Sequence, residues 1–215
     1  MIIDCNCTTT TLPATGAKRC GENFGQIQIL AFEKLSDKQS GLNAVSAIDV
    51  KANWTAGMTA TKVQLTPEVK GWEQSGGDAV NWGEDVDPDG IPMKVRDNPV
   101  QLNVTFRGAK ESVMAKIEEM RCLAQMKDLG LYLFTTDSKI LGVDNSTTLD
   151  SFPVEYISVA PRVIGVRDEP DSSVVSMYIP ASYWRKMGSA NCDKLTGTDT
   201  AAAGAWRGID LLAVS

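Results

Sequence analysis

The segment Asp85-Val86-Asp87-Pro88-Asp89-Gly90 has the residue types of a cation-binding loop. Alternate carboxylates followed by a glycine form the first half of an EF-hand calcium loop, because the glycine permits a sharp turn that points oxygens inward. The same pattern requires a bidentate glutamate at its twelfth position, where this sequence has Arg96. An arginine there would bring positive charge toward the ion. We therefore interpret Asp85, Asp87 and Asp89 as a solvated acidic turn, with a calcium site as the alternative.

Cysteine thiolates are the second set of side chains that could bind a metal. Cys5, Cys7 and Cys20 lie close together in the sequence, but the single-residue gap is unusual for zinc and a fourth ligand would be distant. With Cys122 and Cys192 the chain has five cysteines, an odd number without the repeated spacing of a disulfide scaffold. We predict a reducing compartment and no bound metal.

Catalytic chemistry has few candidate residues in this chain. The sequence contains no histidine, the usual general base near neutral pH, which excludes most serine, cysteine and many metal-dependent hydrolase mechanisms. Glu118 and Glu119 are adjacent on a predicted helix, so they face different directions and indicate a solvated surface. No phosphate-binding loop or nucleophile elbow is present. The prediction is a protein that is not an enzyme and needs no cofactor.

The charge balance bears on partners and location. Twenty-one lysines and arginines against 27 aspartates and glutamates give a formal net charge of -6, which disfavours a surface that follows phosphates. An acidic wall would instead repel a polyanion and let it pass without adhering. No secretory signal and no apolar run of membrane-spanning length is visible, so we expect a protein that is made and kept in the cytosol, without a membrane.

The apolar pattern predicts a mainly β fold. Val100, Leu102, Val104 and Phe106 alternate with polar residues, which is typical of a strand with one buried face and with Gln101, Asn103 and Thr105 on the other. A single helix is predicted over residues 110–129, because apolar residues recur there every three or four positions before Gly130. The expected architecture is an antiparallel β-sandwich or barrel with one packed helix.

Composition divides the chain into three parts. Residues 1–25 are rich in threonine, glycine and asparagine and predict an extended N-terminal arm. Residues 26–186 form the β-body, which contains a long loop over residues 71–99 dense in glycine, aspartate and proline. Residues 187–215 form a C-terminal arm, whose last apolar residues are expected to dock on the body.

Four tryptophans lie in or beside the predicted loops and the C-terminal arm. Trp72, Trp82, Trp184 and Trp206 are candidate interface residues, because large aromatic side chains often anchor contacts between subunits. The alternative is that each covers the protein's own core. Their coincidence with two arms and a long loop favours assembly.

The block from Arg96-Asp97-Asn98-Pro99 through the strand to Phe106, the helix to Leu129, and Leu131-Tyr132-Leu133-Phe134-Thr135-Thr136 with Ile140-Leu141-Gly142 resembles the middle of tail tube proteins of tailed bacteriophages. The resemblance is one of pattern and covers residues 26–180. The Cys-Asn-Cys opening is also similar to structural proteins of phages that infect gut Bacteroidetes.

The resemblance implies a virion structural protein that is assembled in the host cytoplasm. It would be a homo-oligomer whose hexameric rings stack and enclose a conduit for DNA ejection. Strands of neighbouring copies would close one barrel, with the face of Gln101, Asn103 and Thr105 as a candidate lumen surface. Two other readings fit the composition. One is a neck, stopper or capsid-decoration virion protein, and the other is a monomeric carbohydrate-binding module that stacks its loop tryptophans on sugars.

Overall fold

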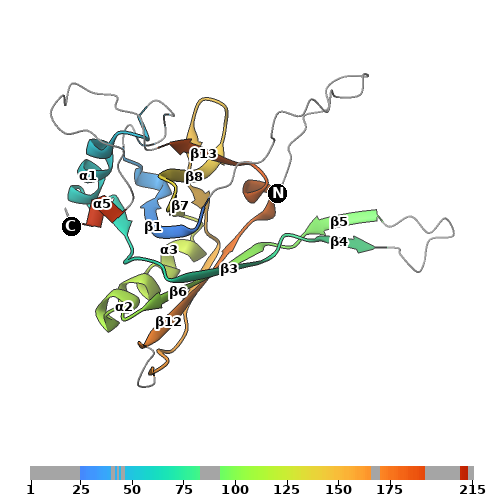
Figure 1. The fold of residues 1–215 in the computed structure, drawn as a ribbon. Coiled ribbons are helices and arrows are strands. Elements are labelled where there is room, and N and C mark those ends of the chain that lie inside the picture. Colours follow the sequence, from blue (N-terminus) through green and yellow to red (C-terminus); the bar gives the residue numbers. More distant parts are fainter. Residues whose placement is uncertain are drawn as a thin grey trace.

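Antiparallel β-strands form most of the computed structural model, which describes residues 25–39, 42, 44, 47–82, 93–165, 170–191 and 209–212. Two sheets pack against each other as a sandwich (Figure 1). The covered sheet has the order β13 (Met187–Asn191), β8 (Lys139–Asp144), β7 (Leu129–Thr135), β1 (Ile27–Lys34), β2 (Val63–Leu65), with β9 (Leu149–Asp150) beside β8 and β10 (Phe152–Pro153) beside β7. The open sheet has the order β11 (Tyr156–Val159), β12 (Ser172–Ile179), β6 (Val100–Arg107), β3 (Gly71–Gly76). The predicted β-sandwich body is confirmed.

The main core lies between the two sheets. Strands β6 and β12 of the open sheet bury every second residue, and all four apolar residues of β6 are buried. The facing side of the covered sheet supplies Leu30, Leu131 and Leu133, all fully buried. The alternation of apolar and polar residues therefore predicted correctly which face of β6 is buried.

A second core covers the other face of the covered sheet. Helices α1 (Lys51–Thr59) and α5 (Ile209–Leu212) lie over this face, and Trp54 and Leu211 are fully buried there. The indole Nε1 of Trp54 donates to the Ile48 carbonyl at 2.7 Å, and its ring packs edge-on against Tyr132 and Phe134. Because both faces of β7 are covered, all its residues are buried, which explains its continuous apolar sequence.

The predicted helix is present as two consecutive pieces. Helices α2 (Glu111–Glu119) and α3 (Arg121–Gln125) lie in the predicted segment and meet at Met120. A short 3-10 helix, η1 (Leu35–Asp37), lies outside this segment and follows β1. Met114, Ile117 and Ala124 are buried against the main core, so the predicted apolar stripe is the packed one. Both pieces lie beside β11, at one edge of the open sheet.

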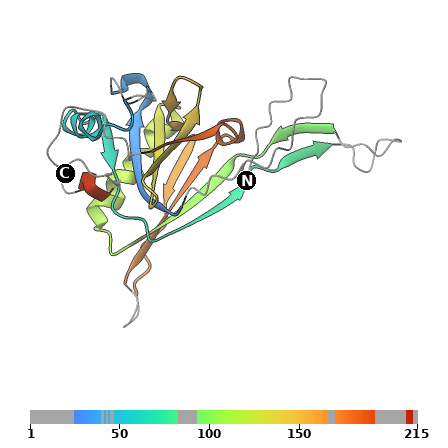
Figure 2. The same cartoon turned by 45° about the horizontal axis from the view of Figure 1, so that its top comes forward.

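The segment predicted as a long loop over residues 71–99 is instead mostly β-structure. Strand β3 pairs with β6, and beyond it β4 (Ala79–Trp82) pairs with β5 (Met93–Asp97), so the two chain segments run together as one long hairpin. Gly76 and Gly77 have φ of 77° and 83° and lie where the pairing changes sheet. A β-carbon on Gly76 would collide with the Pro99 carbonyl, so glycine is required there. We call β4 and β5 the projecting hairpin, because they extend away from the sandwich in Figures 1 and 2.

The C-terminal arm predicted over residues 187–215 begins as a strand of the body and not as an arm. Its first five residues are strand β13 at the edge of the covered sheet, and Leu211 docks on the second core as the apolar end was expected to do. A short helix, α4 (Ala181–Trp184), precedes β13. The N-terminal arm lies outside the described residues except for its last one, Gly25. Among the described helices, none has the length and apolarity needed to cross a membrane.

Candidate functional site

Among the described residues, no helix or strand covers the outer face of the open sheet, whereas both faces of the covered sheet are covered, and we call this outer face the bare face. The residues of β6 that point away from the core are Gln101, Asn103 and Thr105, and all three are half-buried. Cross-strand pairing from β11 to β3 places Gln101 and Asn103 in two central rows: Tyr156, Tyr178, Gln101, Ser75 and Ser158, Ser176, Asn103, Glu73. Only Glu73 in these two rows carries a charge. The centre of the face is therefore polar and carries a single negative charge.

Hydrogen bonds within the face satisfy many of its polar groups. The Tyr178 hydroxyl donates to Gln101 Oε1 at 3.2 Å, and Gln101 Nε2 donates to Asn103 Oδ1 at 3.0 Å. Ser176 Oγ donates to the same Asn103 oxygen at 2.8 Å, which fills both lone pairs of that acceptor. The rings of Tyr156 and Tyr178 meet edge to face with centroids 5.5 Å apart. Such a network holds the surface in one arrangement and contains no nucleophile with an adjacent base.

The edge of the open sheet at β11 is closed. Glu118 on α2 accepts a hydrogen bond from the backbone N–H of Val159 at 2.9 Å and also pairs with Arg121 at 2.9 Å. Glu118 is therefore not merely solvated, as the sequence had predicted. The contact spans 41 residues, so no local pattern reveals it. A backbone donor at this edge is thereby removed from strand pairing with another chain.

The opposite edge of the open sheet, at β3, is open. In the described part of the chain β3 pairs only with β6, and five of its six residues are exposed. Trp72 lies opposite Val104, a core residue, so its side chain is on the core-facing side of the sheet, yet it is 37% exposed. An open strand edge with an exposed tryptophan has the features of a subunit interface. The interface role of Trp72 stays a prediction.

The projecting hairpin is tied to the body at its base. Asp97 at the end of β5 receives both nitrogens of the Arg185 guanidinium, each at 2.5 Å, and Lys94 lies 2.7 Å from the same carboxylate. The Arg185 hydrogen bond, helped by that of Lys94, lowers the pKa of Asp97 from its ordinary 3.8 to about 2. These contacts join the base of the projecting hairpin to the residue that follows α4.

The remaining predicted residues divide into three groups. Trp184 is 7% exposed and packs on Phe152 with ring centroids 5.2 Å apart, so it serves the protein's own core and is not a surface anchor. The backbone of Trp82 belongs to β4, but its side chain lies outside the described part. Outside the described residues are also Trp206, the acidic residues Asp85, Asp87 and Asp89, and the cysteines Cys5, Cys7 and Cys20.

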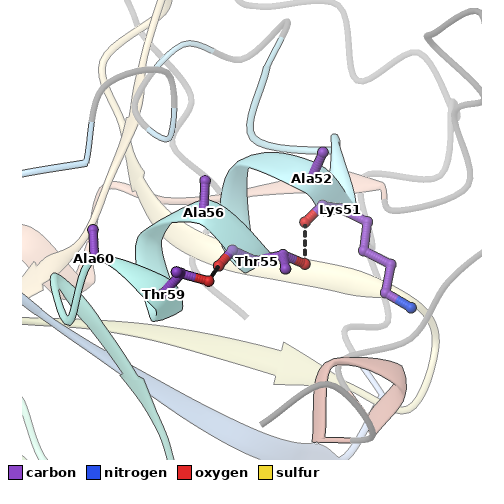
Figure 3. A pocket seen from close by; sticks show the side chains of 6 residues that line it. All are labelled: Lys51, Ala52, Thr55, Ala56, Thr59 and Ala60. Carbon is purple, nitrogen blue, oxygen red and sulfur yellow. Dashed lines mark hydrogen bonds between the residues drawn. The ribbon is translucent and has the colours of Figure 1, made fainter.

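An open surface depression of about 700 Å³ lies along α1, lined by Lys51, Ala52, Thr55, Ala56, Thr59 and Ala60 (Figure 3). The Thr55 hydroxyl donates to the Lys51 carbonyl at 3.3 Å and the Thr59 hydroxyl donates to the Thr55 carbonyl at 2.9 Å. Both hydroxyls are therefore occupied by the backbone of their own helix. The depression offers one lysine and small side chains, and we assign it no chemistry.

No protein-family model matches the sequence, and no curated protein matches it. Among solved structures, a chain from the "Virion of native gene transfer agent (GTA) particle" is a weak structural neighbour, with 9% sequence identity and a TM-score of 0.33. The similarity covers 61% of this chain and 89% of that chain. At this TM-score the similarity supports no conclusion about fold or function.

Proposed function

We propose that this chain is a virion structural protein, similar to a phage tail tube subunit, which polymerises into stacked rings around a conduit for DNA. In each ring the open sheet of every copy would face the bore. The hexameric number and the DNA cargo come from the resemblance of residues 26–180 to tail tube proteins. The role is structural and requires no catalytic group, metal or cofactor.

The observation that carries the proposal is the asymmetry of the open sheet. In the described part of the chain, one of its faces is bare and one of its edges is open, whereas its other face forms the core and its other edge is closed by Glu118. The open edge would be covered by a different surface of a neighbouring copy, and a contact between two different surfaces repeats around an axis and closes a ring where the rotation permits. Trp72 would be buried at that junction.

The chemistry of the bare face suits the passage of DNA. Binding to DNA depends on lysines and arginines that neutralise phosphates, and the two central rows contain neither. The one charge in these rows, Glu73, lies on β3 and would repeat at each junction between copies. Repulsion from the net charge of -6 would add to this at long range.

The test is the assembly state of the purified full chain at high concentration, by sedimentation velocity and negative-stain microscopy. We expect rings or tubes with a central channel. Trp72→Glu should leave the fold intact and abolish them, because it places a charge in the junction. Tyr183→Glu, at an aromatic 45% exposed on α4, is the matched control and should assemble normally.

A parent protein that stays monomeric at all concentrations would contradict the proposal. The edge-to-face pair of Tyr156 and Tyr178 on the bare face would then favour the second candidate, a carbohydrate-binding module, since tyrosine rings can stack on sugars. In that case a panel of soluble glycans should bind to the monomer, and Tyr156→Ala should remove the binding.

A further inference from the structure

The ion pair between Lys38 and Asp150 joins two distant parts of the chain at the covered sheet. Lys38 follows β1 and η1, and Asp150 lies on β9, 112 residues further along the chain. Lys38 Nζ lies 3.3 Å from Asp150 Oδ1. A backbone bridge between Ala44 and Thr148 brings the same two segments together a second time. The lysine nitrogen is therefore held beside the Asp150 carboxyl group by contacts on both sides of it.

This pair is the most shielded of the lysine–carboxylate pairs among the described residues. The side chains of Lys38 and Asp150 are 30% and 26% exposed, whereas every other such pair includes a side chain that is 45% exposed or more. Shielding from water disfavours the two charges and favours a neutral amine beside a neutral acid. The neutral amine of lysine is a nucleophile, whereas the ammonium form has no lone pair to donate.

Two donors hold the second carboxylate oxygen of Asp150. Asn145 Nδ2 donates to Oδ2 at 2.5 Å, and Thr148 Oγ donates to the same oxygen at 3.2 Å. Attack on the carboxyl carbon would place negative charge on one of the two oxygens, and these donors are already directed at Oδ2. Oδ1, the oxygen beside Lys38, is then the one that can leave.

A buried carboxyl group lies next to the pair. Ser151, which follows Asp150 in the chain, donates to Glu33 Oε1 at 2.5 Å. Burial raises the pKa of Glu33, and the charges of Lys38 and Asp150 also act on it. In its neutral form Glu33 adds no second anion that would retain the proton of Lys38. The neutral amine at Lys38 is then easier to form.

We propose that Lys38 and Asp150 form a covalent amide bond within the folded chain. The neutral Nζ attacks Cγ of the protonated carboxyl group, an N–C bond forms, and Asn145 and Thr148 stabilise the negative charge on Oδ2. A proton then passes from the nitrogen to the Oδ1 hydroxyl, which leaves as water while the carbonyl forms again. An ammonium and a carboxylate thus become one amide and one water, without oxidation, reduction or a co-reactant. The fixed position of the two groups supplies the effective concentration that the condensation needs.

The bond would connect the segment after β1 to β9 and close a large loop of the chain. Strands β6, β7 and β8 and helices α1, α2 and α3 all lie within this loop. Closing a loop restricts the unfolded chain, as a disulfide does, and so favours the folded state. This modification site lies on the covered sheet and goes beyond the proposed function, because it requires no second copy of the chain.

The test is the intact mass of the purified full chain after incubation at neutral pH. We expect a mass below that of the sequence by one water molecule, and a tryptic peptide in which the segments containing Lys38 and Asp150 are joined. Lys38→Arg keeps a cation beside Asp150 but lacks the amine, so it should retain the full mass of its sequence. Lys62→Arg is the matched control, because Lys62 lies 2.6 Å from the exposed Asp37, and it should lose water as the parent does.

Asp150→Asn gives a second, independent readout. Its side-chain amide offers the same carbon to Lys38 but releases ammonia, so the variant should yield the same joined peptide with a mass lower by one ammonia molecule. A parent that keeps the full mass of its sequence would overturn the inference. A loss of water that persists in Lys38→Arg would also overturn it, since the dehydration would then lie elsewhere. Rings from a parent without the bond would reject the inference alone, and a monomer that carries the bond would reject the proposed function alone.

Discussion

The covered sheet and the open sheet are built from the same chain but are completed in different ways. The covered sheet has a core on each face, one formed with the open sheet and one formed with α1 and α5. The open sheet has a core on one face, a hydrogen-bonded polar network on the other, and one open edge. Residues in the two cores should therefore determine whether the chain folds, and residues on the bare face and open edge should determine what the folded chain contacts.

The largest expected effect comes from the second core. Trp54→Ala would remove a fully buried ring, its hydrogen bond to Ile48 and its two aromatic contacts. We expect a loss of about 3–5 kcal/mol in the free energy of unfolding, measured by urea denaturation. Asn103→Ala on the bare face should cost at most about 1.5 kcal/mol. Equal losses at the two positions would contradict the difference between the sheets.

A smaller effect is expected at the closed edge. Glu118→Ala would leave the Val159 N–H without its acceptor, at a cost of about 1–2 kcal/mol, and would expose a second pairing edge. Amide hydrogen exchange at Val159 should accelerate, and aggregation should increase. Glu118→Gln retains a carbonyl acceptor and should restore most of the protection. If the alanine variant exchanges like the parent at Val159, α2 itself and not the carboxylate closes the edge.

The third prediction concerns a carboxylate buried in the covered sheet. Glu33 is 2% exposed, and Ser151 donates to its Oε1 at 2.5 Å. Burial raises the pKa of Glu33 above its ordinary 4.5, although the Ser151 hydrogen bond opposes the shift. The folded state thus binds a proton more readily than the unfolded state, so the stabilisation is complete below about pH 4.5 and is lost as pH rises through the folded-state pKa.

Glu33→Gln should reveal this loss. The variant should melt close to the parent at pH 4 and at a higher temperature than the parent at pH 8, because glutamine has no charge to desolvate. Glu119→Gln, on the exposed side of α2, should follow the parent at both pH values. A Glu33→Gln variant that is less stable than the parent at pH 8 would show that the ionised carboxylate is favourable in its site.

The smallest effect on global stability is expected at the base of the projecting hairpin. Asp97→Asn would weaken its contacts with Arg185 and Lys94, so hydrogen exchange in β4 and β5 should accelerate while the unfolding midpoint hardly moves. Because the pKa of Asp97 is lowered to about 2, the parent should keep this protection above about pH 4 and lose it on acidification toward pH 2. Asp78→Asn, an exposed residue on the neighbouring chain segment, should change neither property.

The sequence predicted the elements that bury one regular face. β6 was found because its apolar residues alternate, and α2 with α3 because an apolar stripe packs on the core. Strands β3, β4 and β5 were missed because none of their described side chains is buried, so backbone pairing of β3 with β6 and of β4 with β5 forms them. Helix α1 was missed because only Trp54 and Gly57 of its residues are buried, so no apolar stripe marks it.

Only the local part of the candidate site was predictable from the sequence. The polar side of β6 was identified from alternation, but its partners on β12 lie more than 70 residues away, as Ser176 does from Asn103. The clamp between Asp97 and Arg185 spans 88 residues and the Glu118 contact spans 41. Such pairs depend on the tertiary arrangement and leave no local signature. Trp184 shows the converse, since proximity to a predicted loop did not distinguish a core residue from a surface one.

In the assembly that we propose, the clamp between Asp97 and Arg185 would affect the rate at which subunits add. A hairpin that moved freely would lose orientational freedom each time a subunit docked, and this loss of entropy would oppose every addition. The clamp holds the base of the hairpin within the single chain, so part of that entropy is already lost on folding. Each subunit would then add faster than one whose hairpin moved freely.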